Sequence, residues 1–477
     1  MPGVYNNPMT QYDYDLVVIG GGPAGEKGAA QAAYFGHKVV VIEAYKELGG
    51  HCINWGTLAS KTLRESALFL SGFRNRQLGE GLHVKFKADI TLANFMHRTE
   101  VVQQREQARA IANLKAHGID RVTGTARVAD PHRVVISHYD GEEDITGKFI
   151  LIATGSIPAR PACIPFNDVS VFDSTTVLNM THIPDAIAVI GGGVIGCEYS
   201  CLFEALGVEV HLIYSGRQLL DPLLDEEIGS IFNQRVESMG VNLHFNEQVD
   251  SCVVDGRMVT TTLKSGTQVK TDTVLYALGR SGNTQGLGLE ALGISIGKYG
   301  HIDAVDPIEF QTQVPSIYAA GDVIGPPALV STSMEQARLA VCHAFDMPYK
   351  TRLAPILPTG IYTIPEIAMV GETEQGCRDV GISYVVGRNR YGAQARGQII
   401  GDTEGWIKLI FEAPSGKLLG VHIIGELASE LIHVGMACLH YGGDIDFFIH
   451  SVFNYPTLGD GYKYAAYDAL GKLNEMR

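Results

Sequence analysis

The side chains best suited to chemistry gather in residues 49–61, which read GGHCINWGTLASK. Cys52 offers a thiol, Lys61 offers a cation, and Thr57 places a hydroxyl between them. A thiol stores two electrons as a disulfide only with a second thiol, and a hydroxyl cannot take that part. The segment holds no second cysteine. It therefore predicts no dithiol chemistry of its own.

A nucleotide-binding pattern precedes that segment. Residues 15–19 (DLVVI) form a continuous apolar run, typical of a buried parallel strand. A G-x-G-x-x-G turn follows, then an alanine-rich helix at 25–35 and a strand at 38–42. An acid that binds a ribose diol stands roughly 20 residues after such a turn, and the helix N-terminus attracts a pyrophosphate. The residues that this pattern assigns to a dinucleotide are Gly20, Gly22, Gly25 and Glu43.

The same pattern occurs a second time, after the apolar run at 186–190. A helix and a strand at 209–213 complete the repeat, so we predict two dinucleotides bound by one chain. Tyr214 stands where an NAD-only site holds an acid, and Arg217 follows closely. The missing acid permits NADP(H) without requiring it, because Arg217 can equally be a surface arginine in a loop. The glycines of this repeat are Gly191, Gly193 and Gly196.

The remaining elements are expected from shorter patterns. Cys197 and Cys201 share a helical face, but no histidine or further cysteine clusters with them, so we predict no metal site. We expect a helix at 91–117 and strands at 121–128, 133–137, 149–152, 273–278 and 316–320.

Length, charge and composition limit the number of domains, the partners and the compartment of this protein. The chain has 477 residues, a length typical of about three domains. A net charge of -15 argues against nucleic acid and against an anionic membrane surface. No apolar run reaches the roughly 18 residues of a membrane span, and residues 1–14 contain no signal peptide. Eight scattered cysteines fit a reducing compartment, so we expect a cytoplasmic protein.

The order of these motifs resembles the two-dinucleotide-binding flavoprotein oxidoreductases, the class I pyridine nucleotide-disulfide oxidoreductase family, over about residues 14–470. The resemblance implies an α/β fold with two Rossmann-like domains and a C-terminal α+β dimerisation domain. It implies bound FAD, NAD(P)H as substrate, and a homodimer or higher homo-oligomer. The domains it implies are an FAD-binding domain at 1–160 and 281–351, an NAD(P)-binding domain at 161–280, and a dimerisation domain at 352–477.

The family's motifs also assign individual residues. In the family, residues like 49–61 read G-G-x-C-x-N-x-G-C-x-P-S-K, and a lysine matching Lys61 lies by the flavin and pairs with a glutamate matching Glu198. An aspartate matching Asp322 binds the ribityl chain of FAD, although Asp322 could instead cap a helix. Residues 328–337 resemble the family's helix that packs along the flavin. Further candidates for cofactor binding are Gly50, Cys52, Thr154, Gly155, Gly279 and Ala328.

Two departures from the family's disulfide chemistry occur together. Thr57 replaces the second cysteine, and Tyr455 replaces the histidine that serves dithiol substrates. Members that move hydride between NADPH and NAD+ through FAD, without a disulfide, resemble this chain at both places, although Ala59 replaces their usual proline. The resemblance therefore implies that reaction, with Lys61, Glu198, Thr57 and Tyr455 as catalytic candidates.

Two other functions fit the same motifs. An NAD(P)H dehydrogenase, or diaphorase, that reduces a quinone or another acceptor needs only a reducible flavin and an open site. A redox-sensing flavoprotein would bind the same cofactors but show negligible turnover.

Overall fold

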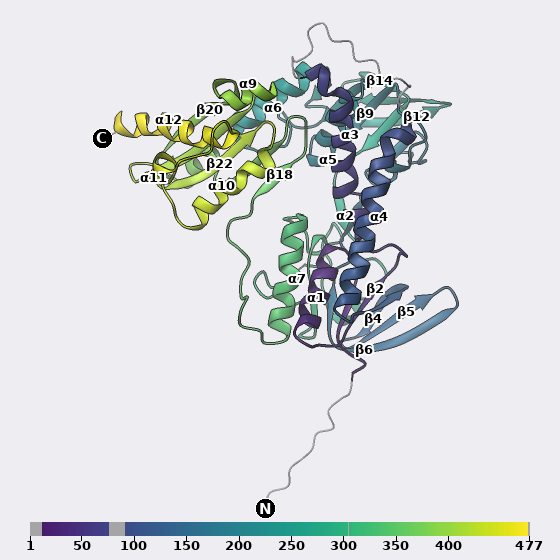
Figure 1. The fold of residues 1–477 in the computed structure, drawn as a ribbon. Coiled ribbons are helices and arrows are strands. Elements are labelled where there is room, and N and C mark those ends of the chain that lie inside the picture. Colours follow the sequence, from purple (N-terminus) through teal and green to yellow (C-terminus); the bar gives the residue numbers. More distant parts are fainter. Residues whose placement is uncertain (1–11, 76–90, 304, 476–477) are drawn as a thin grey trace, which may run out of the picture. The chain divides into compact units, whose positions relative to one another are not determined.

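Short apolar runs and glycine turns organise both halves of the chain. The computed structural model describes residues 12–75, 91–303 and 305–475 (Figure 1). They fold into two units: the first takes the chain up to residue 59 with residues 100–158 and 280–353, and the second takes the remaining segments. Two helices, α3 (Thr57–Asn75) and α4 (Leu92–Ala116), run across a boundary between these units.

The first unit is built on a sheet with strand order β3-β2-β1-β6-β5-β4, and β17 pairs with β6. The β1 strand runs parallel to β2 and β6 and is buried on both faces. Leu16 and Val18 pack towards the helices, where α1 and α7 lie side by side (Figure 1), while Val17 and Ile19 pack on the opposite face with β4 and β5. The elements are β1 (Tyr14–Ile19), α1 (Pro23–Tyr34), β2 (Val39–Glu43), α2 (Gly50–Asn54), β3 (Asp120–Thr123), β4 (Thr125–Asp130), β5 (Arg133–His138), β6 (Gly141–Ile152), β7 (Ser156–Pro158), β16 (Arg280–Gly282), η2 (Glu290–Leu292), β17 (Ile317–Ala319), η3 (Asp322–Ile324) and α7 (Val330–Ala344).

The second unit also contains a parallel sheet that packs against helices. Its parallel sheet has strand order β11-β10-β9-β15-β8. Ile187 and Val189 of β9 pack in a core with α5 and α6, and Ala188 and Ile190 pack on the other face with the small antiparallel sheet β12-β13-β14. The elements are β8 (Val171–Asp173), η1 (Thr176–Asn179), β9 (Ala186–Ile190), α5 (Val194–Ala205), β10 (Glu209–Tyr214), α6 (Glu226–Met239), β11 (Asn242–Phe245), β12 (Val249–Asp255), β13 (Met258–Leu263), β14 (Gln268–Thr271) and β15 (Thr273–Tyr276).

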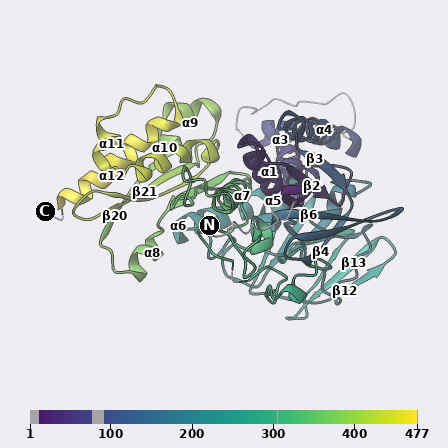
Figure 2. The ribbon, with the colours of Figure 1, turned by 90° about the horizontal axis from the view of Figure 1, so that it is seen from below.

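The C-terminal part of this unit is an antiparallel sheet with order β18-β19-β22-β21-β20. Helices α10 and α12 cover one face of it (Figure 2), where Ile407 and Leu409 are buried. The elements are β18 (Thr359–Ile361), β19 (Ile367–Gly371), α8 (Glu374–Asp379), β20 (Tyr384–Arg390), η4 (Tyr391–Ala393), α9 (Ala395–Ile400), β21 (Trp406–Glu412), β22 (Leu418–Ile424), α10 (Ala428–His440), α11 (Ile445–His450), η5 (Leu458–Asp460) and α12 (Gly461–Glu475).

The structure differs from several expected boundaries, and two of the differences have a clear physical reason. The strand expected at 121–128 is two strands, because β3 pairs parallel with β2 whereas β4 pairs antiparallel with β5. Gly124 stands between them, where a Cβ would lie 2.6 Å from Ile136 Cγ2. The helix expected from 328 begins at Val330, because Leu329 has extended backbone angles.

Candidate active site

The first glycine turn brings backbone atoms unusually close together. Gly20 has a φ of +105°, which favours glycine. A Cβ on Gly25 would lie 1.8 Å from the carbonyl oxygen of Gly20, so only glycine lets α1 approach the end of β1. A Cβ on Gly22, the N-cap of α1, would meet only the Cα of Gly50, at 3.7 Å. This open position beside a helix N-terminus can receive a phosphate.

Glu43 ends β2 beside that turn. Its Oε2 accepts a hydrogen bond from the Gly21 N–H at 2.7 Å, and its Oε1 accepts one from the Tyr45 N–H at 3.1 Å. Burial raises the pKa of Glu43, against the opposing effect of these backbone donors. A carboxylate has about four acceptor positions, so Glu43 can accept further bonds from a ribose.

The segment 49–54 packs against the same turn. Gly50 begins α2, and a Cβ on it would lie 2.9 Å from the Cα of Gly22. Asn54 ends α2; its amide donates to the carbonyl of Leu48, and Gln107 donates to its Oδ1 at 2.7 Å. Cys52 is half-buried in α2, and Thr57, also half-buried, begins α3.

The other candidates in the first unit lie at strand ends. Gly155 has a φ of +69°, and a Cβ there would meet nothing within 4 Å. The Thr154 hydroxyl donates to the carbonyl of Asn283 at 2.7 Å. Asp322 accepts a hydrogen bond from the Ser156 hydroxyl at 2.9 Å. Ala328 is exposed and precedes α7.

Asp322 is not a helix cap. It is the first residue of η3, whose N-cap is Gly321, and no side-chain hydrogen bond caps that helix. The capping alternative is therefore wrong. The carboxylate is half-buried at the end of β17, with Ser156 as its partner.

In the second unit, Lys61 and Glu198 form an ion pair between α3 and α5. Lys61 Nζ lies 2.6 Å from Glu198 Oε2 and 2.8 Å from Oε1. The Glu198 side chain is 8 % exposed and that of Lys61 is 24 % exposed, so the ammonium retains access to a ligand. Glu198 Oε1 also accepts a hydrogen bond from the Tyr362 N–H at 2.9 Å, and the Tyr362 ring centroid lies 5.2 Å from Lys61 Nζ. Tyr362 is a residue that the sequence motifs did not assign.

The second glycine turn reproduces the first. Gly191 has a φ of +125°, and a Cβ on Gly196 would lie 1.8 Å from the Gly191 carbonyl oxygen. A Cβ on Gly193, the N-cap of α5, would meet nothing within 4 Å, and the same is true of Gly279 after β15. Both turns therefore leave space at the N-cap of the helix that follows them.

The loop after β10 differs from its counterpart after β2. The Tyr214 ring replaces the acid: a Cβ on Gly192 would lie 2.5 Å from it, and a Cβ on Gly216 would lie 2.4 Å from it. The Tyr214 hydroxyl donates to the carbonyl of Asp221 at 3.3 Å. Arg217 is exposed.

Tyr455 lies on the surface of the C-terminal part, where it is 70 % exposed. The structure thus brings Lys61 and Glu198 together, and it leaves Tyr455 facing solvent within the chain as described.

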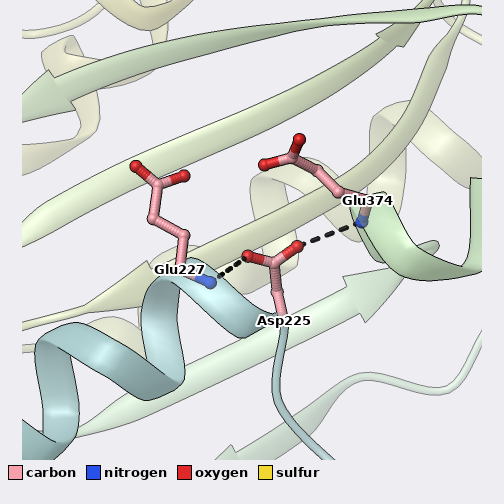
Figure 3. Close-up of side chains that lie close together, drawn as sticks. All are labelled: Asp225, Glu227 and Glu374. Carbon is pink, nitrogen blue, oxygen red and sulfur yellow. Dashed lines mark hydrogen bonds between the residues drawn. The ribbon is translucent and has the colours of Figure 1, made fainter.

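Three carboxylates outside these turns, those of Asp225, Glu227 and Glu374, lie close together (Figure 3), and the Lys408 ammonium pairs with all three. Asp225 caps α6 by accepting from the Glu227 N–H at 3.1 Å and also accepts from the Glu374 N–H at 3.0 Å. Lys408 Nζ lies 2.6 Å from Asp225 and 2.7 Å from Glu227, and it also pairs with Glu374. Burial opposes ionisation of Asp225, but Lys408 and the Glu374 N–H together outweigh it and lower the pKa of that carboxyl. An ammonium supplies the countercharge that a metal ion would bring to this group.

Comparison with known proteins places this architecture in a family. Residues 14–341 match the family model described as pyridine nucleotide-disulphide oxidoreductase, and residues 357–466 match the dimerisation domain of that family. The chain belongs to this family. The α/β fold and the family resemblance expected from the sequence are both confirmed.

Several relatives of this oxidoreductase are similar over nearly their whole length. A protein of Mycobacterium bovis called soluble pyridine nucleotide transhydrogenase is 41% identical, over 97% of this chain and 98% of that one. A protein of the same name from Colwellia psychrerythraea is 37% identical, over 97% and 99%. The crystal structure of LpdA from Mycobacterium tuberculosis superposes with a TM-score of 0.87 at 26% identity, covering 95% of this chain and 99% of that one.

Among the described residues, no helix is both long and apolar enough to cross a bilayer.

Proposed function

We infer that this oxidoreductase transfers hydride between NADPH and NAD+ through bound FAD. Relatives named for pyridine nucleotide transhydrogenation, at 37% and 41% identity over 97% of the chain, support this reaction. The observation that carries the inference is the combination at α3. The helix begins with Thr57 rather than a thiol and retains Lys61 with its Glu198 partner.

FAD fits the first unit and a pyridine nucleotide fits the second. The open positions at Gly22 and Gly155 would receive FAD, with Glu43 on its ribose and Asp322 on its ribityl chain. Gly50, Cys52, Thr154 and Ala328 would complete that site. The open position at Gly193 would receive the nucleotide, together with Gly191, Gly196, Arg217 and Gly279. When bound, FAD supplies the capacity to accept hydride from one pyridine nucleotide and to donate it to another.

The chain's own residues supply position and charge. Glu198 holds the Lys61 ammonium by an ion pair. Beside bound FAD, Lys61 would supply a positive charge that stabilises the negative charge developing on reduction. Thr57 fills the place of a thiol with a group that cannot accept electrons, so no disulfide takes part. Tyr455, being exposed, would act across the dimer interface.

We also propose a division of the chain into three domains, a homodimer, and a cytoplasmic location. The domains are an FAD-binding domain of residues 1–160 and 281–351, an NAD(P)-binding domain of 161–280, and a dimerisation domain of 352–477. Residues 357–466, which match the family's dimerisation domain, support a homodimer. All eight cysteines lie in described segments and none forms a disulfide, which supports a reducing compartment, the cytoplasm.

A competition between acceptors tests the reaction. With NADPH as donor, the purified protein should reduce a thio-NAD+ analogue faster than it reduces a quinone. Rapid quinone reduction with no transfer to thio-NAD+ would instead identify a diaphorase, and stable reduced protein without turnover would identify a sensor.

A further inference from the structure

Tyr362 makes two separate contacts with the Lys61–Glu198 pair. It follows β18, and its N–H donates to Glu198 Oε1 at 2.9 Å. Its ring centroid lies 5.2 Å from Lys61 Nζ, within the range of a cation–π interaction. One residue therefore holds the carboxylate with its backbone and the ammonium with its side chain.

These contacts restrict a side chain that is otherwise mobile. A lysine ammonium sits on a flexible four-carbon stem, so a single carboxylate partner leaves several rotamers open. The Tyr362 ring adds a second attraction from another direction. A cation–π contact at a partly exposed site contributes a factor of about two to five in an equilibrium constant.

The segment that carries Tyr362 is itself fastened to α3. Arg64, one turn after Lys61, donates from Nε to the carbonyl of Thr363 at 2.9 Å. Arg64 Nη1 also lies 3.1 Å from Glu366 Oε1, and both side chains are at most 10 % exposed. Glu366 in turn accepts from the Ser429 hydroxyl at 2.8 Å. The residues 362–366 thus form a rigid support for the helix that presents Lys61.

We propose that Tyr362 is a positioning residue for hydride transfer, which fixes the Lys61 ammonium and thereby sets how strongly the protein stabilises reduced FAD. This inference rests on the proposed function, because it assigns Lys61 to the flavin. The face of the Tyr362 ring holds the Lys61 ammonium. Both contacts of Tyr362 with the ion pair use its N–H and its ring, so we expect the hydroxyl to be dispensable.

Two variants of the full-length FAD-loaded protein test the proposal. Tyr362→Phe keeps the aromatic face, whereas Tyr362→Leu removes it, and both keep the backbone N–H. We expect the leucine variant to stabilise reduced FAD two- to fivefold less, which lowers the two-electron midpoint potential by about 10–20 mV. Its single-turnover reduction by NADPH should slow by at least the same factor with little change in the KM for NADPH. The phenylalanine variant should stay within twofold of the natural protein.

A graded series covers the case in which the leucine variant does not fold. Phenylalanine, 4-fluorophenylalanine and 3,4,5-trifluorophenylalanine placed at position 362 have similar sizes, but the ring face becomes progressively less negative. The midpoint potential should fall along the series. A potential that is constant along the series, or equal in the leucine and phenylalanine variants, would overturn the role of Tyr362. Failure of the natural protein to transfer hydride to thio-NAD+ would instead overturn the proposed function.

Discussion

The Lys61 ammonium is held by Glu198 while about a quarter of the side chain remains exposed, so it can serve a bound cofactor without losing its partner. We expect Lys61→Ala to slow FAD reduction by NADPH about 100-fold, because it removes a positioned charge where negative charge develops. Stopped-flow absorbance of the flavin measures this rate. Lys264→Ala, which removes an exposed lysine in the loop before β14, should leave the rate unchanged. An unchanged rate in Lys61→Ala would remove Lys61 from the mechanism.

Tyr214 offers a test of nucleotide preference. Tyr214→Glu restores the acid that Glu43 provides in the first turn, where it lies against Gly21 as Tyr214 lies against Gly192. A carboxylate repels a 2′-phosphate and accepts from a 2′-hydroxyl. We expect kcat/KM for NADPH to fall about tenfold or more and that for NADH to rise or stay constant. Tyr214→Phe is the control, and a parallel loss for both nucleotides in the glutamate variant would argue against this assignment.

At the scale of single residues, the family resemblance implied the pairing of Lys61 with Glu198, which the structure shows, but it gave no role to Tyr362. Motif spacing reports contacts within a turn, a helix or a repeat. Tyr362 is about 300 residues from Lys61 along the chain, and its N–H and ring act at places that only the folded backbone brings together. The contact of the Tyr214 ring with Gly192 and Gly216 was not predicted either, because the motif assigns backbone positions and not the packing of a side chain.

Close approach of helix and strand is the central feature at the scale of elements. Gly25→Ala would place a Cβ 1.8 Å from the Gly20 carbonyl oxygen, so α1 must shift away from β1. We expect weaker FAD retention and a loss of stability of about 1–3 kcal/mol. In Gly471→Ala, within α12, the Cβ meets nothing within 4 Å, and helix propensity predicts a gain of about 1 kcal/mol. Thermal unfolding with flavin fluorescence distinguishes the two; equal behaviour would contradict the packing argument.

The Lys408 cluster joins α6, α8 and β21, and its charge balance sets a pH dependence. We expect Lys408→Met to cost about 3–5 kcal/mol, because buried carboxylates lose their partner. Lys417→Met, at an exposed position, should cost little. Urea unfolding measures both variants.

The sign of the pH effect follows from the lowered pKa values of Asp225 and Glu227, whose ordinary values are 3.8 and 4.5. A carboxyl with a depressed folded pKa adds stability that is present above its unfolded pKa and is lost as the pH falls through the folded one. The free energy of unfolding of the natural protein should therefore decline below about pH 4.5. In Lys408→Met this decline should be weaker, and an identical decline would contradict the assignment.

Elements with strong patterns were predictable. The β9 strand has the expected bounds, Ala186–Ile190, because an apolar run is bounded there by a charged residue and glycines. The long α4 differs from the expected 91–117 by one residue at each end. The break between β3 and β4 was not predictable, because it arises from pairing with different partner strands.

At the scale of the whole molecule, the duplicated glycine turn indicates two bound dinucleotides, and the family comparison confirms the class of protein. Tyr455 is exposed within a single chain, so its proposed role requires a second chain. At this scale we propose that electrons pass between two nucleotides through one flavin, with no second redox group.

An anaerobic titration of the FAD-loaded protein with NADPH, followed by NAD+, tests that statement most directly. We predict that one NADPH per FAD completes the reduction, that no thiolate charge-transfer band appears at long wavelength, and that NAD+ restores the oxidised spectrum. Consumption of two NADPH per FAD, which indicates a four-electron capacity and hence a redox-active disulfide, would contradict the account.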